Sequence, residues 1–299
     1  MLASTLGKPP AAKARASTEQ HHMASRRGRS GDDILYGSAQ RDHLSGLNGD
    51  DRMYGRDGDD RMAGGAGNDY LSGGKGTDIL LGDTGDDRLY GDQGKDSLYG
   101  GANRDALFGG PGADRLDGGA GRDALHGGDG ADRLVYDAQD RLIDGDAGRD
   151  TLIIGGSGVT LDLNLAGTPR IDHIEVIDLN GAGANTLRLD AADVLAINTQ
   201  HTLLVMGGAD DSVISPTDVW TQNVAGAVDI GGQHYLAWDV GLAHLLVDAD
   251  ITLNNVTPGG ESFASFQNVF FSSFTDVSLV HRGTIGPLTE FPIVEPPPV

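Results

Sequence analysis

Between Gly28 and Val135 one large apolar side chain returns every nine residues, and glycine and polar residues fill most positions between. This residue is the eighth of each nonapeptide, leucine in ten units and methionine in two. A single apolar position with outward-facing neighbours has the alternation of a β-strand. The pattern predicts short strands at positions 7 to 9 that bury a single column of side chains. The column residues are Leu35, Leu44, Met53, Met62, Leu71, Leu80, Leu89, Leu98, Leu107, Leu116, Leu125 and Leu134.

Glycine and aspartate hold the other fixed positions of the repeat. Position 1 is glycine in all twelve units, position 4 is glycine in ten, and position 6 is aspartate in all twelve. Glycine permits backbone conformations that other residues avoid, so positions 1, 2 and 4 predict a tight turn. Asn103 at position 4 tolerates the left-handed region, whereas Gln40 fits it poorly. Asp83 and Asp92 replace the second glycine, which either loosens those turns or adds a ligand.

The aspartate at position 6 indicates a metal site. A glycine turn aims carbonyl oxygens at one point, and the aspartate adds a carboxylate there. Hard oxygen ligands of these two kinds suit Ca²⁺. The candidate ligands are Asp33, Asp42, Asp51, Asp60, Asp69, Asp78, Asp87, Asp96, Asp105, Asp114, Asp123 and Asp132, with Asp150 as an extension.

The nonapeptide period continues for two further units beyond Val135. Tyr136–Asp144 keeps an apolar residue at position 8 but has Arg141 where the aspartate should stand. Gly145–Ile153 then restores the pattern with Asp150. We therefore predict that the array extends over 28–153, with one degraded unit that keeps its core residue and loses its carboxylate.

Composition and charge indicate that the array needs a cation. The chain of 299 residues has a net charge of −22, which argues against nucleic-acid binding and against anionic membranes. One apolar side chain in nine residues cannot offset an ordering entropy of about 1–2 kcal/mol per residue. We therefore expect folding and metal binding to be one event. The metal-free array should be expanded, because rows of aspartate repel one another.

The pattern G-G-x-G-x-D-x-U-x over Gly28–Val135 resembles the RTX, or haemolysin-type, calcium-binding repeats. The resemblance implies a right-handed parallel β-roll with two nonapeptides per turn and Ca²⁺ between unit i and unit i+2. Up to roughly ten such ions are then expected. It also implies export of the unfolded chain by type I secretion machinery, guided by an uncleaved C-terminal signal. The fold class expected is thus all-β, with the roll followed by a β-rich cap or a continued β-solenoid.

The regions outside the array have different compositions. Residues 1–27 carry few apolar side chains and are predicted to be a disordered leader. Residues 154–255 are β-rich, with a helical turn or a corner at 190–198. Residues 256–299 form a segment rich in phenylalanine and a proline-rich tail. This segment is either an export signal or an element docked on the β-rich region. Phe263, Phe266, Phe270 and Phe274 have helical spacing there.

No recognised catalytic spacing accompanies the repeats. The chain has no cysteine, no H-E-x-x-H and no G-x-S-x-G, and the His residues are scattered. No apolar run approaches the ~20 residues that span a bilayer. We therefore predict a non-enzymatic, secreted, extracellular calcium-binding protein. In this prediction the array acts as a folding, export and structural module.

Two alternatives come from other function classes. Tyr36, Tyr54, Tyr90 and Phe108 fall at position 9 of odd units and should share one outer sheet face. Cross-strand packing explains them most simply. A stacking surface would instead make the protein a surface adhesin or polysaccharide-binding protein that contacts a cell-surface glycan, a role also open to the two Trp residues. The second alternative is a β-helix enzyme that modifies polysaccharides.

Overall fold

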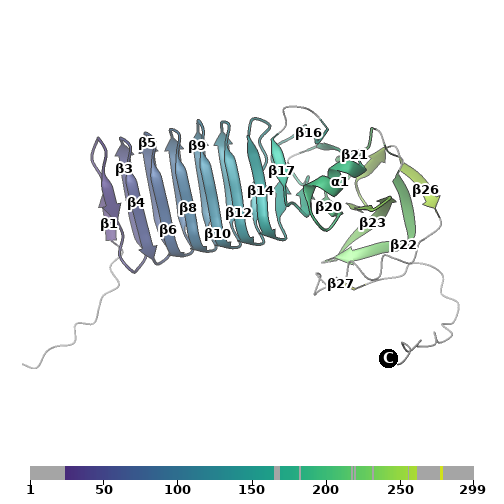
Figure 1. Ribbon diagram of the computed structural model, residues 1–299, viewed down its shortest axis with the longest axis horizontal. Helices are drawn as coiled ribbons and strands as arrows, with labels where there is room; N and C mark the ends of the chain where they lie inside the picture. The colour runs from purple at the N-terminus through teal and green to yellow at the C-terminus, as the bar shows by residue number, and fades with distance from the viewer. Residues whose placement is uncertain are drawn as a thin grey trace, which may run out of the picture.

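The computed structural model describes residues 24–164, 169–181, 183–216, 218, 220–230, 232–254, 256–260 and 277–278. The described residues form β-strands and one short helix. Figure 1 shows the strands of the repeats stacked along the long axis, with the remaining elements gathered at one end. The all-β solenoid predicted from the repeats is confirmed.

The repeats form two facing parallel sheets, because consecutive nonapeptides alternate between them. Sheet A contains β1 (Ala24–Arg27), β3 (Asp42–Asn48), β5 (Arg61–Ala66), β7 (Ile79–Thr84), β9 (Ser97–Ala102), β11 (Arg115–Ala120), β13 (Arg133–Val135) and β15 (Thr151–Ile153). Sheet B contains β2 (Ile34–Tyr36), β4 (Arg52–Asp57), β6 (Tyr70–Gly76), β8 (Arg88–Gly94), β10 (Ala106–Gly112), β12 (Ala124–Gly130), β14 (Leu142–Gly148) and β17 (Arg170–Asp172). Leu89 pairs with Leu107 in this register, so one coil of the roll is two nonapeptides.

Most strands of the roll are longer than positions 7 to 9. The strand β6, for example, covers seven residues and runs through Gly73 and Gly74 into the next unit. Gly74 pairs with Arg56 on one side and with Asp92 on the other. The glycine turns therefore take part in the same parallel ladders as the apolar positions.

The predicted column of apolar side chains is the core of the roll. From Met53 to Leu134 every column residue is fully buried, and Leu44 is 3% exposed. Ile143 and Leu152 extend the column into the two later units. Leu35 is only partly buried because it lies at the open N-terminal end.

The described array begins before the first nonapeptide. Residues 24–27, which the sequence assigned to the leader, form β1 and pair with β3. Ala24 and Arg26 stand in register with Asp42 and Leu44. An edge strand can pair with a sheet through backbone hydrogen bonds alone. It therefore needs neither the aspartate nor the apolar residue of the repeat. The rest of the predicted leader, residues 1–23, lies outside the described residues.

Beyond the repeats the solenoid both continues and is capped. Sheet A extends from β15 through β18 (Val176–Asp178) and β20 (Thr202–Met206) to β24 (Ala243–Asp248), all in parallel. A third parallel sheet contains β16 (Thr160–Asp162), β19 (Thr186–Arg188), β21 (Ser212–Ile214) and β25 (Thr252–Asn254). The edge of sheet A is then covered by β23 (Gln233–Val240), β22 (Trp220–Ile230), β26 (Val256–Gly260) and β27 (Val277–Ser278). We call residues 154–254 the cap region.

The helix of the cap region lies where the sequence allowed a helical turn or a corner. Helix α1 (Ala191–Ile197) begins at Asp190, whose side chain accepts from the backbone of Ala192 and Asp193. The Asp193 side chain in turn accepts from the backbone N–H of Asp190, which completes a capping box. Val194 and Ile197 are buried in the core. The phenylalanine positions 263, 266, 270 and 274 lie outside the described residues.

Candidate metal centre

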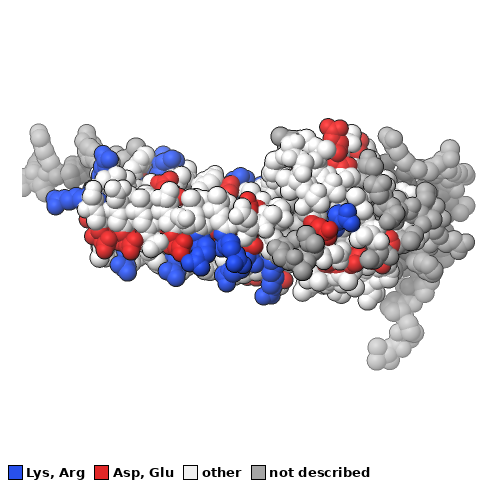
Figure 2. All heavy atoms as spheres, turned by 90° about the horizontal axis from the view of Figure 1, so that it is seen from above, with Lys and Arg blue, Asp and Glu red and all other residues white. Residues whose placement is uncertain are grey.

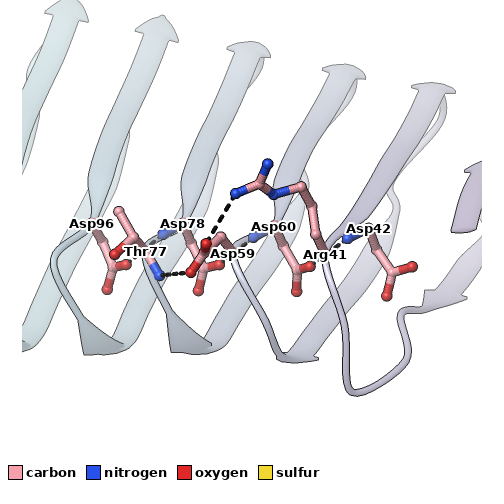
Figure 3. A network of polar contacts seen from close by, with 7 residues as sticks. All are labelled: Arg41, Asp42, Asp59, Asp60, Thr77, Asp78 and Asp96. Atoms are coloured by element: carbon pink, nitrogen blue, oxygen red, sulfur yellow. Dashed lines mark hydrogen bonds and ion pairs between the residues drawn. The ribbon is translucent and has the colours of Figure 1, made fainter. Parts of the chain in front are cut away.

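The position-6 aspartates form two buried rows, one along each sheet of the roll. Within each row the backbone N–H of one aspartate donates to Oδ1 of the aspartate one coil further on, in eleven contacts of 2.6–2.8 Å. Figure 3 shows four members of the sheet A row: Asp42, Asp60, Asp78 and Asp96. From Asp42 onward these aspartates are at most 4% exposed. The structure thus brings the predicted ligands together in two continuous lines.

The second oxygen of most of these carboxylates has no hydrogen-bond partner. A buried carboxylate oxygen without a donor or cation is energetically costly. Such an atom repeated in every coil therefore marks a place built for a positive charge. The unpartnered atoms are Oδ2 of Asp51, Asp60, Asp69, Asp78, Asp87, Asp96, Asp105, Asp114, Asp123, Asp132 and Asp150.

The glycine at position 1 leaves the space beside each of these oxygens. A Cβ atom added at Gly91 would lie 2.7 Å from Asp96 Oδ2 and 2.6 Å from the Gly109 carbonyl oxygen. The two oxygens therefore flank a hollow that any larger side chain would fill. One carboxylate and one carbonyl around such a hollow are the hard donors that suit Ca²⁺.

The structure separates two roles for the glycines that the sequence treated alike. Glycines at position 2 adopt the left-handed region, as Gly65 does with φ 113°. Asn103, Asp83 and Asp92 adopt it too, with φ of 86°, 73° and 68°, as expected for Asn103. Position-1 glycines such as Gly91 show no positive φ. Position 1 is therefore glycine because of space, whereas position 2 is glycine because of backbone conformation.

Burial makes the charged form of these aspartates unfavourable without a cation. Burial, together with the neighbouring carboxylates, raises the pKa of Asp87, Asp96 and Asp105 to about 7, even though a backbone hydrogen bond to each lowers it. Burial likewise raises the pKa of Asp78 and Asp132 to about 6. A cation beside the unpartnered oxygens would reverse this effect.

Residues 27–141 match the family model of the RTX calcium-binding nonapeptide repeat in several overlapping copies. This segment is an array of RTX repeats. The chain thus contains calcium-binding repeats in this segment, and the resemblance stated from the nonapeptide pattern is confirmed. No curated protein matches the chain.

Among solved structures the chain is similar to the extracellular lipase LipA from Serratia marcescens, with 14% sequence identity. The match covers 80% of this chain and 40% of the lipase chain, with a TM-score of 0.13. The chain therefore spans less than half the length of that protein. A similarity this low carries no argument about fold or activity.

The RTX array departs from its own pattern in the first coil. Asp42 Oδ2 accepts from the backbone N–H of Ser38 and from the Ser38 hydroxyl, the latter at 2.9 Å. Asp33 is only partly buried, and its Oδ2 accepts from the Arg29 backbone at 2.6 Å. These two predicted ligands are therefore already satisfied by the protein, unlike the eleven listed above.

At its other end the array contains acidic residues that the sequence prediction missed. Asp140, one residue before Arg141, is 4% exposed and has an unpartnered oxygen. Burial and the neighbouring Asp123 raise the pKa of Asp140 to about 8. The degraded unit has thus shifted its carboxylate by one residue instead of losing it. In sheet A the Asp150 backbone donates to Glu175 Oε2 at 2.9 Å, so glutamate ends that row.

A second, exposed ladder runs along position 5 of the RTX array. Arg41 contacts Asp59 across one coil at 3.0 Å, and the Thr77 backbone donates to Asp59 at 3.0 Å (Figure 3). Arg104 contacts Asp86 in the same way at 2.9 Å. These contacts lower the pKa of Asp59 and of Asp86. On the face shown in Figure 2, basic side chains accordingly stand beside acidic ones along the roll.

In the described part of the cap region, Asn185 and Asp211 stand in register between coils, and both side chains have hydrogen-bond partners. Asn185 Oδ1 accepts from Val159, and the Asn185 backbone donates to Asp211 Oδ1 at 2.8 Å. Asn185 Nδ2 donates to the Leu179 carbonyl at 3.0 Å. Asp211 Oδ2 accepts from Gly208. An amide N–H thus takes the place that a cation would hold beside the roll carboxylates.

The position-9 aromatic residues share the outer face of sheet B as predicted. Tyr36 stacks on Tyr54 with centroids 5.2 Å apart, and Tyr90 stacks on Phe108 at 4.8 Å. Tyr70, a position-7 residue that the sequence prediction omitted, joins Tyr54 to Tyr90. The rings contact one another along the row, stacked in these two pairs and tilted at Tyr70, so the row favours cross-strand packing over a sugar platform.

The two tryptophans are also core residues. Trp220 is 1% exposed and Trp238 is 4% exposed. Neither ring can stack on a ligand in this conformation. In the part of the chain that the structure describes, no helix is long and apolar enough to cross a membrane.

Proposed function

We propose that this protein is a secreted, non-enzymatic folding and structural module whose RTX array closes into its roll on binding calcium. The observation that carries the proposal is the repeated buried Oδ2 atom without a partner. Bound calcium supplies positive charge and coordination at these atoms. In this proposal the ligands are the predicted position-6 aspartates, with Asp33 and Asp42 contributing least because Arg29 and Ser38 already donate to them.

The thin core of the array makes this dependence physically reasonable. A single column of leucine and methionine side chains lies between the two sheets. That burial is too small to offset the ordering entropy of nine residues for each column side chain. The aspartate rows add mutual repulsion to this cost. About ten ions would supply both charge neutralisation and binding free energy.

The same dependence suits a protein that is exported unfolded. Where calcium is scarce, as in the cytoplasm, the aspartates keep their charge in water and the array stays expanded. At the millimolar concentrations outside the cell, weak sites fill and the coils close. We propose export by type I secretion machinery on this basis.

A calcium titration of the full chain tests the proposal. We expect far-UV circular dichroism to gain β signal cooperatively with calcium and to lose it with EGTA. Both tryptophans lie in the cap region, so their fluorescence follows that region separately. Magnesium at equal concentration is the control, because Mg²⁺ demands stricter geometry and keeps its waters. Full β signal retained in EGTA would contradict the proposed folding switch.

The two alternative functions have less support. A glycan platform needs open aromatic faces, whereas the sheet B rings cover one another and both tryptophans are buried. Most of the His–Asp contacts among the described residues are partly exposed contacts between neighbouring strands, as in His234 Nδ1 with Asp229 Oδ1. They do not assemble the paired acid and base of a polysaccharide-modifying enzyme.

A further inference from the structure

A cluster of three potential metal ligands lies on the outer surface of sheet B, away from the aspartate rows. It consists of His126 on β12 and of Asp144 and Asp146 on β14. One ligand atom of each residue lies within 4.8 Å of the others, and His126 Nδ1 is 3.6 Å from Asp146 Oδ2. In the described part of the chain no other group of His and acidic residues meets this geometry. Figure 1 places β14 beside β17, where the roll meets the cap region.

The structure holds the imidazole of His126 in place. The ring stacks on Phe108 with centroids 5.1 Å apart and an interplanar angle of 4°. His126 is directly opposite Asp144 in the parallel register of β12 and β14. It is thus the last member of the aromatic row and the first member of the acidic cluster.

Two neighbouring contacts of Asp144 use the same carboxylate oxygen. Asp144 Oδ1 accepts from His173 Nδ1 at 2.7 Å and from the Asp146 backbone at 3.1 Å. These contacts hold the Asp144 carboxylate in one orientation through Oδ1. Asp146 is held at φ 63°, a left-handed conformation that aspartate tolerates better than most residues.

The donor set distinguishes this cluster from the calcium sites. Ca²⁺ takes oxygen ligands, whereas imidazole nitrogen favours zinc, copper, nickel and related ions. Tetrahedral zinc with bonds of 2.0–2.1 Å separates its ligand atoms by about 3.3 Å. The separation of 3.6 Å between His126 and Asp146 is already close to that value.

We propose that His126, Asp144 and Asp146 form a divalent transition-metal site of the zinc class on the outside of the roll. The site would link the outer faces of β12 and β14, and His173 would act as a positioning residue through Asp144. It goes beyond the proposed calcium-dependent folding, because it uses none of the position-6 aspartates.

Zinc titration of the calcium-saturated full chain tests this site. Saturating calcium keeps the aspartate rows filled, so isothermal titration calorimetry then measures added zinc at other positions. We expect one zinc ion per chain, and His126→Ala and Asp146→Asn should each weaken it at least tenfold. His43→Ala is the matched control, since His43 is exposed on β3 outside the cluster. His173→Gln should weaken zinc about tenfold, as for other residues that orient a metal ligand.

Cobalt gives an independent spectroscopic readout. Co²⁺ added to the calcium-saturated protein should produce visible absorption that His126→Ala removes and His43→Ala keeps. Circular dichroism in calcium checks that each variant retains the roll, and Asp146→Asn serves if His126→Ala does not fold. Zinc binding that is absent in the wild-type chain, or unchanged in both cluster variants, would overturn the proposal. Failure of this site leaves the calcium response of the roll unaffected, so the two proposals are tested separately.

Discussion

The glycines at positions 1 and 2 of the nonapeptide have different physical roles in this protein. The position-2 residue adopts a left-handed conformation, and five non-glycine residues manage the same geometry. They are Leu47, Arg56, Asp83, Asp92 and Asp146. Position 1 is glycine in every unit that has the position-6 aspartate, because its missing side chain is the hollow beside the aspartate oxygen.

Gly91→Ala should therefore damage one metal hollow without disturbing backbone conformation. The added methyl group would lie 2.6 Å from the Gly109 carbonyl oxygen, closer than normal contact. We expect a loss of about 1–3 kcal/mol in the calcium-bound state, as for other overpacked sites. We also expect fewer bound calcium ions. Thermal melts in calcium and equilibrium dialysis measure both.

Gly155→Ala is the control for this substitution. Gly155 also lacks a positive φ, and a Cβ atom there would meet nothing within 4 Å. Equal calcium binding by Gly91→Ala and the wild-type chain would show that the hollow does not hold the ion.

At the scale of single coils, the roll and the cap region differ in how they satisfy the polar side chain between neighbouring turns. Each coil needs a partner for the oxygen that faces the next turn. In the roll the aspartate leaves Oδ2 unpartnered, whereas in the cap region Asn185 turns its own amide N–H to the Leu179 carbonyl. One side-chain atom therefore decides whether such a turn needs a metal ion. An aspartate Oδ2 needs a cation, whereas the Nδ2 of Asn185 finds its partner within the protein.

Asn185→Asp should destabilise the cap region in a way that calcium does not repair. The substitution removes the donor to Leu179 and places a carboxylate against a carbonyl oxygen. We expect a loss of about 1–3 kcal/mol, the cost of an unsatisfied buried polar group. Tryptophan fluorescence during urea unfolding, with and without calcium, measures it.

Asn68→Asp provides the matched change on the surface of the roll. Asn68 is exposed and occupies a column in which Asp50 and Asp86 already stand. The Asn68→Asp substitution should leave the free energy of unfolding nearly unchanged. A wild-type unfolding curve for Asn185→Asp would refute the role assigned to its amide.

At the scale of the whole molecule, most of the buried carboxylates among the described residues lie inside the roll. The exposed position-5 ladder pairs acids with arginines, whereas the buried aspartate rows contain no basic side chain. The net charge of −22 is spread along the chain, but its buried part is concentrated in the roll, where a cation is needed.

This arrangement predicts opposite pH responses with and without calcium. The pKa of Asp87, Asp96 and Asp105 is raised from 3.8 to about 7 in the metal-free roll. A raised pKa favours the folded state at low pH, and this contribution is lost as pH rises through about 7. In EGTA, β signal should therefore increase between pH 8 and pH 5. With limiting calcium it should decrease over the same range, because protons compete for the ligands.

Circular dichroism at both pH values, with sedimentation to detect aggregation, measures this difference. A metal-free chain that loses β signal on acidification would contradict the pKa assignment. The same experiment on Asp87→Asn should show a smaller pH response, since one titrating carboxylate has been removed.

Several features could be read from the sequence because the repeat is local and strict. The apolar column and the repeated aspartates follow from residue spacing, whereas the alternation between two sheets was implied by the resemblance to RTX repeats. The strand β1 could not be read in this way, because its residues match neither the aspartate nor the apolar position. Asp140 was missed because a one-residue shift in the turn moved it out of the expected position.

The sequence by itself determined the coil, its core and the oxygen donors, since each depends on residues within one period. Only the tertiary structure decided which carboxylate oxygens are left without a partner, and that Asn185 and Asp211 close the later coils without one. It also brought His126 to Asp144 and Asp146 from the next coil. The physical reason is that these properties depend on contacts between neighbouring turns, which the order of residues within a turn does not specify.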